Sequence, residues 1–345
     1  MRRSATFNPG VALATTVPLP RAANFVTMSA MSKTLNARGL ALVESAIAGA
    51  DDLGIAVREC PGGGRVIDCG VEARGGLSAG LLLARVTLAD LAHVDLDSGS
   101  GPFPFPQVAV HTDAPVSACM ASQYAGWAIS VGKYFAMGSG PMRAAYGGEE
   151  LFAHIGRRES PDAVVGVLEA RKLPGAEVFA HLAEKLKVEP RQITLLVAPT
   201  ASIAGGLQIV SRSVETALHK LHALRFDIER VVAGFGSAPL PPVAKGDLAA
   251  IGRTNDAILY GSRVTLWVRG DEDSVARIGP QVPSSASSAH GAPFAEIFEA
   301  AGRDFYKIDA ALFSPAEIHF QCLESGRTHS FGRLEPEILR RSFLG

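Results

Sequence analysis

The chain contains few cysteines, few aromatic residues, almost no net charge and no long apolar run. Four cysteines occur in 345 residues, and aromatic residues make up 7% of the total. The cysteines show neither CxxC spacing nor a nearby histidine pair, so the sequence predicts neither a zinc site nor a disulfide framework. We therefore expect reduced thiols, as in a cytoplasmic protein. The cysteines are Cys60, Cys69, Cys119 and Cys322.

The small net charge and the short apolar runs exclude two large classes of partner. A formal net charge of −1 creates no global field that would attract nucleic acid or an anionic membrane. No apolar run reaches the roughly 20 residues that a membrane-spanning helix needs. Apolar residues make up 47% of the chain, which suffices for real cores. Small polar or zwitterionic molecules remain the compatible ligands.

The length predicts about two domains behind an atypical N-terminus. Residues 1–33 are basic, contain proline and lack acidic residues, and Asn8–Gly10 interrupt any compact apolar segment after Arg2 and Arg3. We expect a disordered N-terminal extension there. The remainder divides into a first domain at 34–175 and a second at 176–345, whose C-terminal part is rich in β-like sequence.

Helix-like and strand-like segments alternate along the body of the chain, which predicts a layered α/β architecture. Residues 108–127 and 195–215 each read as a strand that ends in threonine, a turn of small residues and a helix. An internal duplication explains this likeness, and so does the common use of threonine as a helix cap. A duplication would place two similar α/β domains on either side of a substrate cleft. We expect helices at 35–48, 75–91, 114–129, 175–186 and 202–224, and strands at 65–69, 107–111, 134–137, 163–169, 193–198 and 317–323.

The segment from Ser202 to Arg225 reads as one helix with an apolar stripe and a polar flank. The stripe residues follow three-and-four spacing, and Gln208, Arg212, Glu215 and His219 fall together beside it. Arg212 and Glu215 are three residues apart, so their side chains can touch. Two interpretations stay open, namely a surface ion pair of little net value and a general base oriented by an arginine. The stripe consists of Leu207, Val210, Val214, Leu218 and Leu221.

Two further segments contain glycine and polar residues in a pattern that could bind a ligand. The turn Gly138-Ser139-Gly140-Pro141 follows a predicted strand and opens a helix, so it either makes a tight turn or presents backbone amides to an anion. It is neither a Walker loop nor a complete dinucleotide fingerprint. The run 252–256 (GRTND) is explained by a helix cap or Asx turn, or by a loop that binds a polar heterocycle. His111-Thr112-Asp113 lacks a third metal ligand, so we predict no metal site.

Eight phrases in order resemble one family, methenyltetrahydromethanopterin cyclohydrolase, from about Leu35 to Phe343. The resemblance implies reversible hydrolysis of the cyclic methenyl group of tetrahydromethanopterin to the formyl derivative, in one-carbon metabolism or formaldehyde oxidation. It also implies no metal, no nucleotide cofactor, a pterin as substrate, and a homo-oligomer, specifically a trimer. The phrases are QYAGW, FAMGSGPMRA, APT, VETALHK, GFGSAPLPP, GRTNDAILYG, HGAPFAEIF and DFYKIDAALFSPA.

The resemblance selects the general-base interpretation for the Ser202–Arg225 helix. Glu215 would take a proton from the attacking water, while Arg212 would orient Glu215 and keep it ionised. Substrate-binding roles follow for three further sets: Gly138, Ser139 and Gly140 for the pterin or its anionic tail, Arg253, Asn255, Asp256 and Asp309 for the heterocycle, and Gln123, Tyr124 and Trp127 for the opposite wall.

Two other functions remain as alternatives. A nucleotide-dependent oxidoreductase would use the turn at 138–141 to hold a phosphate. A non-catalytic pterin-binding protein would keep the cleft without the chemistry, although an intact Arg212 and Glu215 speak against it.

Overall fold

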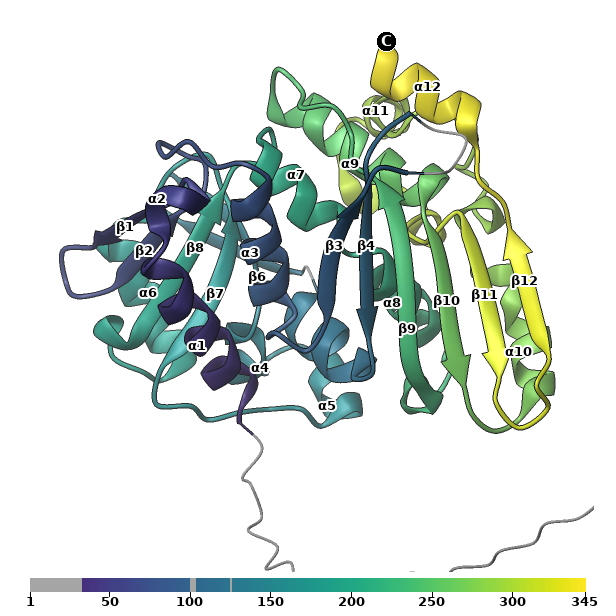
Figure 1. Cartoon of the computed structure of the whole chain (residues 1–345), viewed down its shortest axis with the longest axis horizontal. Helices are drawn as coiled ribbons and strands as arrows, with labels where there is room; N and C mark the ends of the chain where they lie inside the picture. Colours follow the sequence, from purple (N-terminus) through teal and green to yellow (C-terminus); the bar gives the residue numbers. More distant parts are fainter. Residues whose placement is uncertain (1–32, 100–103, 125) are drawn as a thin grey trace, which may run out of the picture. The chain divides into compact units, whose positions relative to one another are not determined.

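A computed structural model describes residues 33–99, 104–124 and 126–345, and these form a mixed α/β structure with two six-stranded sheets. The predicted α/β class is confirmed. Figure 1 shows the two sheets, each with its helices. Of the predicted extension 1–33, all but Lys33 lies outside the described residues. Within the described part of the chain, no helix is long and apolar enough to cross a membrane.

The first sheet is buried on both faces at its centre. Its central strands, β7 and β8, pair in parallel and read as continuous apolar runs because helices cover both sides. Val165 and Leu196 pack in the cluster that contains α1 (Leu35–Ile47) and α3 (Leu77–Thr87), while Leu168 and Leu195 pack in the cluster that contains α6 (Ala176–Leu186). The strand order is β1 (Ala56–Glu59), β2 (Arg65–Asp68), β8 (Ile193–Ala198), β7 (Val164–Glu169), β6 (Tyr134–Ser139) and β5 (Trp127–Val131).

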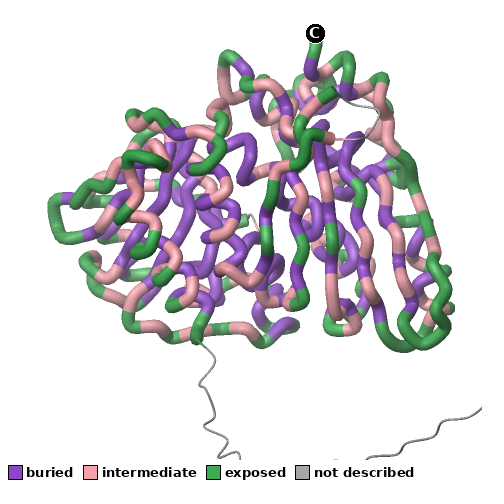
Figure 2. The backbone as a smooth tube through the Cα atoms, in the orientation of Figure 1, coloured by how far each residue is buried: buried purple, intermediate pink, exposed green. Residues whose placement is uncertain are grey.

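The second sheet has one face covered by helices and one face largely uncovered. Its strands alternate buried and more exposed residues, in contrast to the uniformly buried centre of the first sheet (Figure 2). This alternation is typical of a largely antiparallel sheet with a single packed face. The strand order is β12 (Thr328–Gly332), β11 (Glu317–Cys322), β10 (Arg263–Val268), β9 (Val231–Pro239), β4 (Gln107–Thr112) and β3 (His93–Asp97).

The chain passes between the two sheets more than once. After β2 it supplies β3 and β4 to the second sheet, and it then returns to the first sheet for β5 to β8. Neither sheet is therefore made by 34–175 or by 176–345 alone, the two ranges that the sequence predicts as domains.

The α-helices are α1 (Leu35–Ile47), α2 (Ala50–Leu53), α3 (Leu77–Thr87), α4 (Met142–Tyr146), α5 (Leu151–Ile155), α6 (Ala176–Leu186), α7 (Ile203–Val210), α8 (Ser213–Ala223), α9 (Asp247–Gly261), α10 (Glu272–Ile278), α11 (Phe294–Ala300) and α12 (Pro336–Leu344).

Three predicted elements differ in the structure. The helix expected at 202–224 is two helices, α7 and α8, with Ser211 and Arg212 between them. The helix expected at 114–129 is a π-helix at Val116–Gln123 that gives way to β5. The run 252–256, expected as a cap or loop, lies inside α9. In the first case the apolar spacing continues through the break, so hydrophobic periodicity alone could not reveal it.

Candidate functional site

The break between α7 and α8 lies where the chain passes from one sheet to the other. Helix α7 packs closely on α3, where a Cβ at Gly80 would come within 2.9 Å of the Leu207 Cβ. Helix α8 lies against β9, where a Cβ at Gly236 would meet the Ser213 side chain. Ser211 promotes the break because its hydroxyl donates to the Gln208 carbonyl at 2.7 Å, a bond that competes with regular helix. Figure 1 shows α7 between the two sheets and α8 behind the strands of the second sheet.

Because of the break, the Arg212 side chain does not run along α8. It takes part in a buried hydrogen-bond network. Its guanidinium donates to the backbone carbonyl of Gln123, to the Ser139 hydroxyl at 3.2 Å and to the Gln208 side-chain carbonyl at 3.3 Å. Its ion-pair partner is Glu169, with Nη2 and Oε1 3.4 Å apart. The Gln208 amide also donates to Glu169 Oε1, at 2.9 Å. Arg212 thus ties together the π-helix, the end of β6 and the end of β7.

The predicted contact between Arg212 and Glu215 needs correction. Among the ion pairs of the described residues, Arg212 pairs with Glu169 and not with Glu215. The reason is local backbone geometry, because Arg212 has φ −87° and ψ 11° at the N-cap of α8 and so lies outside the helical repeat that would align it with Glu215. Arg212 instead acts on Glu215 through its charge, which favours the carboxylate form.

Glu215 is a buried carboxyl group with an unusual pKa. It lies in the first turn of α8 and is 6% exposed. Desolvation raises its pKa to about 7, against the opposing positive charges of Arg212 and Arg143. A carboxyl group with a pKa near neutrality can both accept and donate a proton at physiological pH. The burial of Glu215 beside positive charge therefore suits an acid–base group.

Arg143 is a second buried guanidinium in the surroundings of Glu215. It is fully buried, pairs with Glu149 at 2.5 Å and donates to the Met120 carbonyl at 3.2 Å. Its guanidinium carbon lies 4.4 Å from the centre of the Tyr124 ring. The Tyr124 hydroxyl lies 3.4 Å from His219 Nε2. Burial raises the pKa of Tyr124, and the charge of Glu215 adds to this effect.

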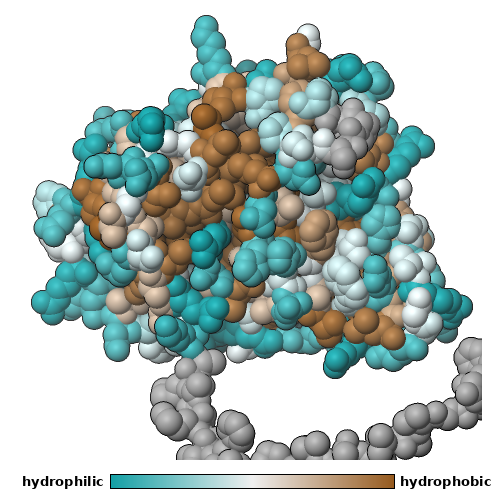
Figure 3. Space-filling model, viewed as in Figure 1, coloured by the Kyte–Doolittle hydropathy of each residue, from teal (hydrophilic) through white to brown (hydrophobic). Residues whose placement is uncertain are grey.

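Two hollows are lined partly by residues of these elements. One, of about 250 Å³, is lined by Tyr124, Gly126, Glu149, Glu150, Leu151, His219 and His222. The other, of about 320 Å³, is bounded by α3 and α7 on one side and by residues 240–254 on the other, and its lining includes Leu77, Ile203, Val243 and Arg253. Figure 3 shows apolar surface over this region of α3 and α7.

Some predicted binding residues meet at the Arg212 network. Gln123 and Ser139 bond directly to Arg212, and Tyr124 follows Gln123 at the end of the π-helix. Ser139 Oγ accepts from Arg212, and the Gly140 amide donates to the Ser122 carbonyl at 2.9 Å. Both groups of this turn are thus satisfied within the protein, which weighs against the expected phosphate-holding turn of an oxidoreductase.

Other predicted residues have partners elsewhere. Trp127 stacks on Tyr146 at 4.4 Å in the first sheet's core, and a Cβ at Gly138 would collide with that core. The remaining four lie around α9 and the loops beside the second sheet. Arg253 donates to the Pro242 and Ser342 carbonyls, Asn255 donates to the Ile251 carbonyl, Asp256 accepts from the Phe294 amide, and Asp309 accepts from the Ser287 hydroxyl. Their contacts to a heterocycle stay a prediction.

Sequence reasoning missed Glu169 and Arg143. Glu169 is the first charged residue after the apolar run of β7, at the end of a buried parallel strand, and polar residues at such ends are frequent site residues. Arg143 lies within the phrase FAMGSGPMRA that carries the resemblance, but nothing in its spacing signals complete burial. Only the fold brings these two residues to the surroundings of Arg212 and Glu215.

The chain is similar to known proteins of one family over almost its whole described length. A family model described as "Cyclohydrolase (MCH)" matches residues 34–343. The chain is 50% identical to the methenyltetrahydromethanopterin cyclohydrolase of Rhodopirellula baltica, over 81% of this chain and 86% of that protein. It is 45% identical to the protein of the same name from Methylobacillus flagellatus, over 88% and 93%, and 43% identical to that of Methanosarcina barkeri, over 90% and 98%.

Proposed function

Because the chain belongs to the methenyltetrahydromethanopterin cyclohydrolase family, we propose that Glu215 is the acid–base group with which it hydrolyses the cyclic methenyl group of its pterin substrate. The enzyme is a hydrolase that acts on a carbon–nitrogen bond of a cyclic amidine. The single observation that carries the proposed role is the burial of Glu215, which raises its pKa to about 7 beside two guanidinium groups.

The methenyl carbon between two nitrogens is a delocalised amidinium cation and is already electrophilic. Glu215 takes a proton from a water molecule as the water oxygen bonds to this carbon. One ring carbon–nitrogen bond then breaks and the oxygen becomes the formyl oxygen. Of the two water protons, one ends on the departing nitrogen and the other is released to solvent. The negative charge of ionised Glu215 favours the cationic carbon of the substrate.

Arg212 and Glu169 position this reaction rather than carry it out. Arg212 donates hydrogen bonds to the Gln123 carbonyl and the Ser139 hydroxyl, so it fixes the positions of these two predicted binding residues. Glu169 and Gln208 hold Arg212 in turn. Glu169 also offsets part of the Arg212 charge, and this limits how far Arg212 lowers the pKa of Glu215.

The variant Glu215→Gln tests the proposed role. We expect turnover to fall at least about a hundredfold, the usual contribution of an acid–base group, while substrate still binds. The measurement is the loss of the methenyl chromophore in stopped flow, with the tetrahydromethanopterin substrate and its folate analogue compared side by side. Glu229→Gln is the matched control, since Glu229 pairs with Arg157 at 2.8 Å and is exposed. Near-normal turnover by Glu215→Gln would remove Glu215 from the mechanism.

Three further expectations belong to this proposal. The family resemblance supports a homo-oligomer, specifically a trimer, and light scattering of the purified protein measures this directly. It also supports a reaction that needs no metal and no nucleotide cofactor. We expect a cytoplasmic location, which fits the reduced thiols predicted from the sequence.

A further inference from the structure

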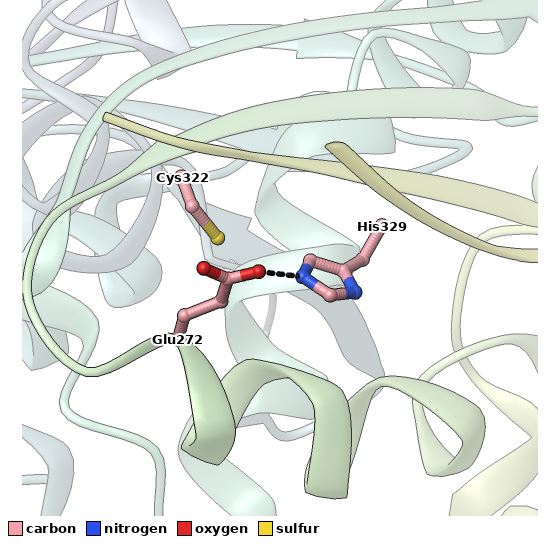
Figure 4. A group of neighbouring side chains, drawn as sticks. All are labelled: Glu272, Cys322 and His329. Carbon is pink, nitrogen blue, oxygen red and sulfur yellow. Dashed lines mark hydrogen bonds and ion pairs between the residues drawn. The ribbon is translucent and has the colours of Figure 1, made fainter. Parts of the chain in front are cut away.

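Three side chains that commonly bind transition metals converge at the edge of the second sheet, apart from the Glu215 region. Glu272 lies in the first turn of α10, Cys322 ends β11, and His329 is the second residue of β12. One donor atom from each residue lies within 4.8 Å of the other two. Figure 4 shows the carboxylate, the thiol and the imidazole pointing toward one another.

The fold brings these residues together across a hairpin and a helix. His329 pairs directly with Phe320 in the antiparallel ladder, so both side chains lie on the same face of the sheet. Cys322 is two residues beyond Phe320 and shares that face. Glu272 reaches this face from α10. The sequence gives no sign of the cluster, because Glu272 precedes Cys322 by fifty positions and the hairpin separates Cys322 from His329.

The arrangement is that of ligands around one point and not that of a proton relay. In a nucleophile–base–acid relay the imidazole uses a different nitrogen for each neighbour. Here His329 Nε2 lies 2.6 Å from Glu272 Oε1, and Figure 4 shows that the same nitrogen is the one nearer the Cys322 thiol. The other ring nitrogen points away from the cluster.

We propose that Glu272, Cys322 and His329 form a binding site for a divalent ion of the zinc class. Thiolate, imidazole and carboxylate are the ligands that Zn²⁺ takes at about 2.0–2.3 Å, with a fourth position left for water. Binding requires the thiol to release its proton to solvent. It also requires His329 to carry its proton on the nitrogen that points away, so that the Nε2 lone pair faces the ion.

One cation already contacts this cluster. Arg327 donates to Glu272 Oε2 from Nε at 3.1 Å and from Nη2 at 2.8 Å. The Arg327 side chain is 72% exposed, so it can leave the carboxylate for water when an ion arrives. The ion would then join α10 to the β11–β12 hairpin at the sheet's edge strand. This site is separate from Glu215, and the ion would take no part in hydrolysis there.

Cobalt(II) is the probe, because its thiolate complexes absorb in the near ultraviolet whereas zinc is silent. Titration of the full-length metal-free protein should give a thiolate charge-transfer band that saturates at one cobalt per chain and is bleached by zinc. Cys322→Ser should abolish the band, and His329→Gln should weaken binding at least about tenfold. Cys60→Ser is the matched control, since Cys60 is also buried but lies in the first sheet's core.

A second variant separates a metal site from a simple ion-pair network and does not disturb the core. Arg327→Ala removes the competing cation and should strengthen cobalt binding, whereas Arg157→Ala, at another exposed ion pair, should leave it unchanged. Absence of a thiolate band in the unaltered protein would overturn the proposal. So would a band of equal intensity in Cys322→Ser, or cobalt binding that Arg327→Ala does not strengthen.

Discussion

Replacing Glu215 by glutamine should make the protein more stable while it removes activity. In the folded protein the pKa of Glu215 is about 7, raised from 4.5 chiefly by desolvation. The folded state therefore holds this proton more tightly than the unfolded chain, and ionised Glu215 lowers stability above pH 7. The loss develops as the pH rises from about 4.5 to about 7 and is absent below that window. Glutamine carries no charge, so the variant does not lose this stability.

The size of the effect follows from the shift. A difference of 2.5 pKa units, from 4.5 to about 7, corresponds to about 3 kcal/mol in the free energy of unfolding at pH values above 7. Glu215→Gln should recover most of this at pH 8 and almost none at pH 4.5. The stabilised variant would be the inactive one, a known consequence of placing a charge where function needs it.

Urea denaturation of both proteins at pH 8 and at pH 4.5 measures the difference. Asp68→Asn serves as a control of opposite sign. Burial disfavours the charge of Asp68, but four backbone amides donate to its carboxylate and outweigh burial, so its pKa is lowered. That variant should lose stability at pH 8. If Glu215→Gln is no more stable than the unaltered enzyme at pH 8, Glu215 does not carry a buried charge and the argument from desolvation fails.

Three other predictions follow from the same contacts. Glu169→Gln should lower the pKa of Glu215 by about one unit, because the positive charge of Arg212 is then no longer partly neutralised. The acid limb of the kcat/KM pH profile should therefore move to lower pH. A reduced rate with an unmoved limb would mean that Glu169 only packs against its neighbours. Arg212→Lys should reduce turnover at least about tenfold, because one ammonium cannot hold Gln123, Ser139 and Glu169 together, and steady-state kinetics measures this. Incubation with EDTA should leave hydrolysis by the unaltered enzyme and by Cys322→Ser intact in the chromophore assay, and inactivation of Cys322→Ser that a divalent ion rescues would contradict the metal-free reaction.

Much of the fold could be predicted because its strands carry strong local signals. The runs at 164–169 and 193–198 are continuous, β-branched and buried on both faces, so their pattern is unambiguous. Strand β3 at His93–Asp97 gave no such signal, because its alternation of histidine, aspartate and apolar residues is typical of an edge strand and of a loop alike.

The candidate site was predictable only in part, and for a physical reason. Glu215 could be named as a candidate because it lies on the polar flank of an amphipathic segment, but only the family resemblance selected the general-base interpretation over a surface ion pair. The partner of Arg212 could not, because the two-residue break before α8 is set by a side-chain hydrogen bond from Ser211 and by packing against both sheets. Glu169 and Arg143 depend on tertiary contacts that no spacing in the sequence encodes.

The repeated passage of the chain between the sheets has a consequence for synthesis on the ribosome. Strand β8 pairs with β2 on one side and with β7 on the other, so these two strands cannot be joined in the first sheet until residue 198 has emerged. Strand β4 must wait for β9, because Thr112 pairs with Gly234. A nascent chain that stops before β9 therefore carries an unpaired strand edge open to intermolecular pairing. The first sheet can be completed once β8 has emerged, whereas the second sheet needs β12 near the C-terminus, so we expect premature termination to yield aggregation-prone fragments and not a stable half-enzyme.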